Sequence, residues 1–228
     1  MDILHIDSAI IVLNKPAGLP VLPDGWEKDA PYLVKMLEQQ YGAASSSTRQ
    51  GIWIVHRLDK VTSGVMVFAR TAQAHRDLSV QFEKHEAEKV YHAIIVGVPA
   101  WDEKIAKHPL RVNVGHKHRT AVDLRRGRPS ETRFKTLERY SAHGLIVAQI
   151  MTGRTHQIRA HAYALGYPLL GDTLYGAPET ELIARPALHA YTLTIANPEN
   201  GERTTFTAPY PPDFSEALER LRLGTSKL

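Results

Sequence analysis

The sequence contains no cysteine among its 228 residues. This absence excludes disulfide bonds, thiolate nucleophiles, iron–sulfur clusters and zinc sites built on cysteine. No apolar run approaches the roughly 20 residues that a membrane-spanning helix needs. The N-terminal residues 1–5 also lack the basic and apolar segments of a secretion signal. We therefore expect a cytoplasmic protein that does not enter a membrane.

The chain also lacks the glycine-rich nucleotide-binding motifs, the nucleophile-elbow serine and the His-Glu-x-x-His zinc motif. Four histidines could suggest a metal site instead, namely His116, His118, His156 and His161. The last two are five residues apart, so on a helix their side chains point to different sides. We therefore expect no metal, and interpret these histidines as surface or hydrogen-bonding residues.

Positive charge is concentrated in one segment. The whole chain carries a net charge of +4, whereas residues 111–135 hold eight lysines and arginines against two acidic residues. This local excess of six positive charges exceeds that of the whole chain, so the remainder is slightly acidic. The segment could be a solvated loop and hairpin, or it could bind the phosphates of a nucleic acid.

Short strands and helices follow one another without a strict strand–helix–strand alternation. Alternating or β-branched patterns predict strands at 3–6, 9–13, 64–69, 89–98, 132–140, 145–151, 189–196 and 204–208. Helices are expected at about 30–41, after a cap at Thr71, at 155–165 and at 214–223. This order favours the α+β class, with a mixed, mostly antiparallel central sheet flanked by helices. We expect a single domain over residues 1–228, with one core or a core of two lobes.

The segment His56-Arg57-Leu58-Asp59-Lys60 places imidazole, guanidinium, carboxylate and ammonium groups next to one another. It follows the apolar run 52–55 and precedes the strand expected at 64–69. Asp59 is therefore expected on a loop held at both ends by the core, a common position for a catalytic group. Composition alone would favour a surface turn with a local Arg–Asp pair.

This segment, followed by Thr62-Ser63-Gly64, resembles the catalytic motif of the RluA family of pseudouridine synthases. Asn14-Lys15-Pro16-Ala17-Gly18 resembles the family's N-terminal motif, and Lys89-Val90-Tyr91 resembles its Lys-x-Tyr strand. Residues 152–161, with Gly166, Pro168 and Leu170-Gly171-Asp172 after them, resemble its C-terminal motif. One such string would be weak evidence, but four motifs in the family's order, over about residues 3–210, are specific. We expect a short, single-domain form of the family, without the S4-like RNA-binding domain that precedes the core in many members.

The resemblance implies a pseudouridine synthase fold with a catalytic cleft. It implies isomerisation of specific uridines in structured ribosomal or transfer RNA, by base flipping and by cleavage and re-formation of the glycosidic bond. An isomerisation needs neither a redox cofactor nor ATP, so no cofactor is expected. By resemblance Asp59 is the catalytic carboxylate, Tyr91 stacks on the uracil, and Arg159 pairs with Asp59.

A helical wheel supports the availability of Arg159. Ile158, Ala162 and Leu165 form an apolar stripe, and beside it on another face lie Thr155, Arg159 and Tyr163.

The enzyme is expected to be a monomer. Further residues are expected to contact its RNA substrate. Arg57 is expected to contact a phosphate or to fill the space that the flipped base vacates, and His56 lies beside it. Ile158 and Leu170 could line the uracil pocket, although a role in the core is equally consistent. Phosphate contacts are expected from Arg125, Arg126 and Arg128.

Two other functions remain open. A non-catalytic RNA-binding module could share this fold, although the presence of Asp59, Tyr91 and Arg159 disfavours it. A nucleoside or sugar hydrolase could use Asp59 as a nucleophile. That reaction would need a second, acidic carboxyl group nearby, and no motif supplies one.

Overall fold

The computed structural model describes residues 2–23, 30–42, 51–115 and 119–225. The chain forms two compact units. Unit 1 comprises residues 1–89 and 190–209, and unit 2 comprises residues 90–189 and 210–228. Whether both units act as the single catalytic domain expected from the sequence stays a prediction.

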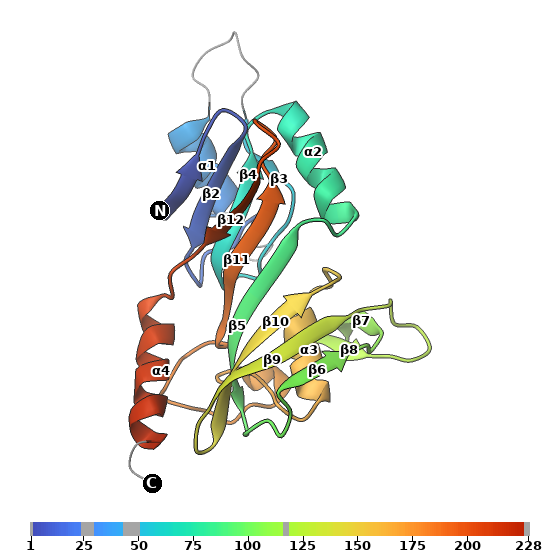
Figure 1. Ribbon diagram of the computed structural model, residues 1–228, viewed down its shortest axis with the longest axis vertical. Coiled ribbons are helices and arrows are strands. Elements are labelled where there is room, and N and C mark those ends of the chain that lie inside the picture. The colour runs from blue at the N-terminus through green and yellow to red at the C-terminus, as the bar shows by residue number, and fades with distance from the viewer. Residues whose placement is uncertain (1, 24–29, 43–50, 116–118, 226–228) are drawn as a thin grey trace. The chain divides into compact units, whose positions relative to one another are not determined.

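Unit 1 is built on a sheet. Its elements are β1 (Asp2–Ile6), β2 (Ile10–Lys15), α1 (Leu33–Tyr41), β3 (Trp53–Ile54), β4 (Ser63–Ala69), α2 (Ala72–Glu83), most of β11 (Leu188–Ala196) and β12 (Arg203–Thr207). The strands follow the order β1, β2, β4 and β11, with β3 also paired to β4 and β12 paired to β11 (Figure 1). The pairings of β1 with β2, β2 with β4, β3 with β4 and β11 with β12 are antiparallel.

The central strand β4 explains why the segment after Asp59 is anchored. All seven of its residues are buried, as expected for a continuous apolar run. Its second residue, Gly64, has φ +121°, and a Cβ there would lie 2.2 Å from the carbonyl oxygen of Ala190. Only glycine permits this close approach of β4 to β11 within unit 1. Thr71 caps α2 as predicted, because its side chain accepts a hydrogen bond from the backbone nitrogen of Ala74 at 3.1 Å.

Unit 2 contains a second set of strands. Its elements are most of β5 (Glu88–Val96), β6 (Glu103–Ala106), β7 (Leu110–Val114), β8 (Arg119–Val122), β9 (Thr132–Arg139), β10 (His143–Ile150), α3 (Gln157–Ala164), the 3-10 turn η1 (Thr173–Tyr175) and α4 (Pro212–Thr225). β5, β10, β9 and β6 are neighbours in that order, and β7 pairs with β8 in a separate hairpin (Figure 1). The pairings β5–β10, β10–β9, β9–β6 and β7–β8 are antiparallel.

Two hydrophobic clusters hold unit 2 together. In the larger one, Phe214 and Leu218 of α4 pack with Ile94 of β5, Leu145 of β10 and Leu170. The smaller one joins Leu110 of β7, Ala160 of α3 and Tyr175 of η1. The helix that carries Arg159 is therefore fixed against the β7–β8 hairpin by burial of apolar surface.

The observed elements confirm the α+β class, with a mostly antiparallel sheet and helices. The helix expected from about residue 30 begins at Leu33, because the extended residue Tyr32 occupies its N-cap position. The short strands β6, β7 and β8 were not predicted. None of the helices in the described ranges is long and apolar enough to cross a membrane.

Candidate active site

Asp59 lies in unit 1 on the loop between β3 and β4. The loop is tightly turned, because the backbone nitrogen of Thr62 donates to the carbonyl oxygen of Asp59 at 3.0 Å. It is also bound to the N-terminal motif, since the backbone nitrogen of Gly18 donates to the carbonyl oxygen of Lys60 at 2.8 Å. The residue following Asp59 is thus held by a segment more than 40 positions earlier in the chain.

Lys15 strengthens this link. Its side chain is fully buried. The ammonium donates to the carbonyl oxygens of Pro16 at 2.8 Å, Leu19 at 2.9 Å and Lys60 at 3.2 Å. A buried ammonium is tolerated only when hydrogen bonds replace its hydration, and these carbonyls supply them. The N-terminal motif therefore supports the loop that carries Asp59.

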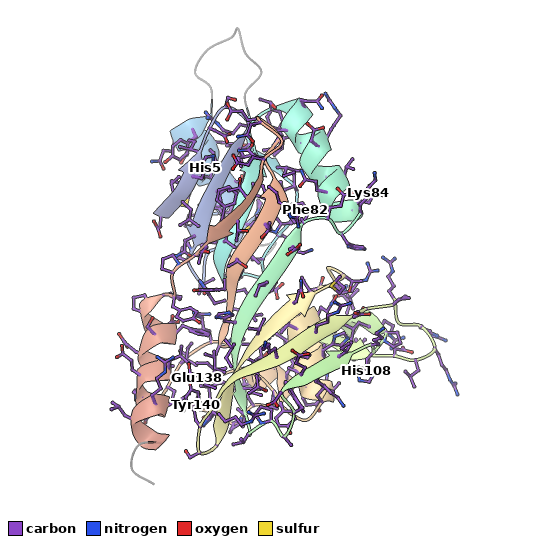
Figure 2. The ribbon with its side chains drawn as sticks, viewed as in Figure 1. His5, Phe82, Lys84, His108, Glu138 and Tyr140 are labelled. Atoms are coloured by element: carbon purple, nitrogen blue, oxygen red, sulfur yellow. The ribbon has the colours of Figure 1, made fainter. Side chains whose placement is uncertain are left out.

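His56 is integrated into unit 1. Its Nε2 accepts a hydrogen bond from the backbone nitrogen of Val67 at 3.2 Å, and its ring stacks on Phe82 with centroids 4.6 Å apart. Figure 2 labels Phe82, which belongs to α2. Burial of the ring, with the positive charge of Lys89, lowers the pKa of His56 to about 3. The neutral imidazole is therefore a structural partner of β4, and its contact with substrate stays a prediction. The neighbouring Arg57 is exposed, as a contact with RNA requires.

Tyr91 and Arg159 both lie in unit 2, whereas Asp59 lies in unit 1. Tyr91 is in β5, opposite Ala148 of β10, and only 7% of its surface is exposed. The predicted pairing of Arg159 with Asp59 and the predicted stacking of Tyr91 on uracil stay predictions.

Within unit 2, Arg159 forms a buried ion pair with Asp172. Its Nε donates to Oδ2 of Asp172 at 2.6 Å, and its Nη2 donates to Oδ1 at 2.8 Å. The side chains of Arg159 and Asp172 are only 6% and 1% exposed. Two parallel charge-assisted bonds of this kind fix the plane of the guanidinium as well as its position.

Arg159 and Tyr163 of α3 lie on one face, as the helical wheel predicted, since both contact the ring of Tyr175. The wheel did not predict their burial, because Tyr163 is 45% exposed whereas Arg159 is buried. All residues from Gln157 to Ala162 are buried, so the helix is covered on most sides. Arg159 tolerates this environment because Asp172 balances its charge and accepts its hydrogen bonds.

The polar residues around α3 are hydrogen-bonded to unit 2. The side-chain oxygen of Gln157 accepts from Thr152 at 2.7 Å, and its nitrogen donates to the carbonyl oxygen of Glu131 at 2.9 Å. His161 is fully buried between the hydroxyl of Thr132 at 2.8 Å and the carbonyl oxygen of His108 at 2.9 Å. Figure 2 labels His108, which precedes β7. The hydrogen-bonding interpretation of His161 is thus confirmed by its contacts.

His156, at the N-cap of α3, lies with its Nδ1 3.3 Å from the hydroxyl of Tyr175. His116 and His118 lie outside the described residues.

Ile158 and Leu170 are both buried, at 4% and 1% exposure. Leu170 belongs to the larger hydrophobic cluster, and its backbone nitrogen donates to the carbonyl oxygen of Ile94 at 2.8 Å. These contacts give Leu170 a place in the core of unit 2. A contact of either residue with uracil stays a prediction.

The basic segment contains two classes of cation. Arg111 and Arg133 form ion pairs, with Asp123 at 3.1 Å and Glu131 at 3.1 Å. By contrast, Arg125, Arg126 and Arg128 are exposed, and across the described residues their side chains form no ion pair.

Asp123 also shapes the backbone of this turn. Its Oδ1 accepts from the backbone nitrogens of Arg125 at 3.0 Å and Arg126 at 2.9 Å. These arginines therefore project from an ordered turn, which suits contacts with phosphates.

Two residues next to Arg159 were not singled out from the sequence. Asp172 was noted only as part of a motif, and Tyr175 was not noted at all. The available signal was a lone acid that follows the apolar residues Leu169 and Leu170 after a single glycine, Gly171. A buried acid of this kind needs a basic partner, and Arg159 was the candidate within the same motif.

A comparison with protein families matches residues 9–164 to the RNA pseudouridylate synthase family. The ribosomal large subunit pseudouridine synthase D of Neisseria meningitidis is 40% identical over 234 residues, covering 98% of this chain and 62% of that protein. The dual-specificity RNA pseudouridine synthase RluA of Escherichia coli is 38% identical over 210 residues, covering 91% of this chain and 92% of that protein. Human RNA pseudouridylate synthase domain containing 4 has a similar structure, with a TM-score of 0.78 and 25% identity over 97% of this chain and 93% of that one.

These matches lead from a class of protein to a family. The fold is that of a pseudouridine synthase domain. The chain belongs to the RNA pseudouridylate synthase family, and the predicted resemblance to RluA is confirmed. The chain spans 62% of the length of the Neisseria meningitidis relative, so that protein contains sequence for which this chain has no counterpart.

Proposed function

We propose that this chain converts uridine in RNA to pseudouridine, with Asp59 as the essential carboxylate. The observation that carries the proposal is the position of Asp59 on a braced loop of unit 1, within the residues that match the family. Bonds from Gly18 and Lys15 to the carbonyl oxygen of Lys60 fix the backbone next to it. A catalytic carboxylate needs a backbone of this rigidity.

The reaction breaks the N1–C1′ bond, turns the uracil and joins C5 to C1′. The proton on C5 is lost and N1 gains a proton, so the atoms balance without an oxidant, a reductant or ATP. Asp59 supplies the anion that attacks or deprotonates the nucleoside. Tyr91 offers an aromatic face to the uracil and a phenol for proton transfer. Arg159 would pair with Asp59, as the resemblance to the family implies.

The substrate proposed is a specific uridine of structured ribosomal or transfer RNA. The relatives' names support this choice, since one acts on the ribosomal large subunit and another has dual specificity. A uridine within a helix must be extruded, which costs a few kcal/mol. Arg57 would compensate by contacting a phosphate or filling the vacated stack, while Arg125, Arg126 and Arg128 would contact phosphates. We further propose that the enzyme acts as a monomer in the cytoplasm, without a cofactor.

A tritium-release assay tests the proposed activity. RNA transcribed with uridine labelled at C5 is incubated with the protein, and released tritium is measured together with free uracil and bound RNA. Release of tritium without free uracil supports isomerisation. Free uracil would indicate the hydrolase alternative, and binding without either product would indicate a non-catalytic RNA-binding module.

The target uridine can be found by mapping. Pseudouridines are compared in the ribosomal and transfer RNA of cells that have and that lack the gene. A position modified only in the presence of the gene identifies the substrate. If no position differs, the proposed RNA classes are wrong.

A further inference from the structure

The guanidinium of Arg159 is held along its edge. Its Nε and Nη2 donate to the two oxygens of Asp172 at 2.6 and 2.8 Å. A guanidinium carries five N–H groups in one plane, and two of them are directed to Asp172. With this edge fixed by two parallel bonds, the direction of the other N–H groups is also determined.

The same guanidinium is supported on its face. The carbon Cζ of Arg159 lies 5.0 Å from the centroid of the Tyr175 ring, within the range of a cation–π contact. The Tyr175 hydroxyl accepts from the backbone nitrogen of Thr120 at 2.9 Å and donates to its carbonyl oxygen at 3.0 Å. Tyr175 is 1% exposed, so its ring is fixed by both packing and hydrogen bonds.

The backbone places both supports on one short turn. The backbone nitrogen of Tyr175 donates to the carbonyl oxygen of Asp172 at 3.0 Å, which closes η1. Gly171 precedes this turn with φ +75°, and a Cβ there would lie 2.3 Å from the carbonyl oxygen of Arg185. Asp172 and Tyr175 therefore reach Arg159 only because glycine permits this close approach.

We propose that Asp172 and Tyr175 are positioning residues that orient the guanidinium of Arg159 for the reaction, an inference that rests on the proposed function. Asp172 balances the charge of Arg159. The contribution of Arg159 is therefore the direction of its remaining N–H groups more than an excess of positive charge. A planar fork held in this way is pre-organised, so little reorganisation is needed when the substrate reacts.

The test is a double-mutant cycle of Asp172→Asn and Arg159→Lys. Single-turnover rate at saturating RNA and Kd for RNA are measured for each variant and for the double variant. Asp172→Asn is expected to lower the rate by about tenfold or more and to change Kd by less than about threefold. In the Arg159→Lys background the same change is expected to have little further effect, because the two residues act through one guanidinium.

Glu138→Gln is the control. Arg222 and Glu138 form a second bidentate pair in unit 2, with Nε–Oε2 and Nη2–Oε1 distances of 3.0 and 2.6 Å. Breaking this pair is expected to lower thermal stability and to leave the single-turnover rate unchanged. A similar loss of rate in both variants would reduce the effect of Asp172 to general destabilisation and overturn the proposal.

Two more variants keep the proposal testable if Asp172→Asn is unfolded at the assay temperature. Asp172→Glu retains the charge and moves the carboxylate by one methylene, and it is expected to lower the rate with little change in Kd. Tyr175→Phe keeps the ring and is expected to retain a larger share of the rate than Tyr175→Leu. If Asp172→Asn or Asp172→Glu reacts at the wild-type rate, the inference about Asp172 is refuted. The proposed function would still stand in that case, because the wild-type protein is active. An inactive wild type would refute the proposed function itself.

Discussion

Unit 2 carries two groups of arginine that share a charge and differ in environment. Arg159 is buried and held by two bonds to Asp172, whereas Arg125, Arg126 and Arg128 project into solvent from an ordered turn. Removing one partner of a buried ion pair typically costs about 3–5 kcal/mol, because an uncompensated charge remains. An exposed arginine can be removed with little effect on the fold.

This difference teaches how one unit can separate chemistry from binding. The buried arginine is held in a fixed orientation, so under the proposed function its effect would depend on geometry and fall on the reaction step. The exposed arginines would act through counterion release, which depends on the number of phosphates contacted and on salt.

The largest expected effect is that of Asp59→Asn. The amide has nearly the same shape as the carboxylate but can act neither as a base nor as an anion. Turnover should fall by about a hundredfold or more, while folding and RNA affinity are retained. Tritium release, circular dichroism and an RNA-binding titration measure the three properties. Pseudouridine formation within tenfold of the wild-type rate would remove Asp59 from the mechanism.

The next effect is that of Arg159→Lys. Lysine keeps the positive charge but lacks the planar fork that binds both oxygens of Asp172. We expect a large fall in single-turnover rate at saturating RNA, with only a modest change in Kd. A variant that altered affinity alone would place Arg159 with the exposed arginines.

The combined change of Arg125, Arg126 and Arg128 to alanine should have the opposite signature. RNA binding should weaken, and the slope of log affinity against log salt should flatten by up to about 0.7–0.9 for each lost phosphate contact. The saturated single-turnover rate should stay near that of the wild type. A matched control changes the exposed cations Lys35, Lys84 and Arg220, which lie outside the basic segment, to alanine. Equal salt slopes in the two triple variants would show that net charge alone, not this turn, governs binding.

A smaller effect concerns stability and pH, and contrasts the half-buried neutral imidazole of His56 with the buried guanidinium of Arg159. The pKa of His56 is lowered to about 3 by burial and by Lys89, whereas an unfolded histidine titrates near 6.5. Between these values the unfolded chain binds a proton that the folded chain does not. The free energy of unfolding should therefore fall as pH drops through this window, by at most about 1.4 kcal/mol per pH unit.

His56→Gln isolates this contribution from the acidic groups. The glutamine oxygen can accept the hydrogen bond of the Val67 nitrogen but does not titrate. Urea unfolding of both proteins at pH values between 4 and 7 should give a flatter profile for the variant. Identical slopes would exclude His56 as a source of the pH dependence.

No effect is expected from removing divalent metals. A bound metal cation would add positive charge to that of the two groups of arginine. The sequence contains no cysteine that could bind such a cation. Activity on RNA that is already folded should survive EDTA. Loss of activity that zinc alone restores would contradict the expectation. If magnesium restores activity, the assay is repeated on a short stem–loop RNA that folds without magnesium. This second assay distinguishes an effect on RNA folding from an effect on the enzyme.

The sequence by itself determined most of the secondary structure of unit 1 and the position of Asp59. Apolar runs such as 64–69 become buried strands because their side chains need cover on both faces. The cap at Thr71 depends only on local geometry. Motifs of fixed order were sufficient for the family, and they also predicted which residues the proposed site contains.

Tertiary structure alone decided the environment of Arg159. A helical wheel describes periodicity within one helix, and it has no information about a carboxylate 13 positions later. Asp172 reaches the guanidinium only through the positive-φ turn at Gly171. The strands β7 and β8 were not predicted, because many of their residues are exposed and their sequence has only a weak alternating pattern. They form strands because they pair with each other. Burial of a charge depends on a partner distant in sequence, and such partners meet only when the chain is folded.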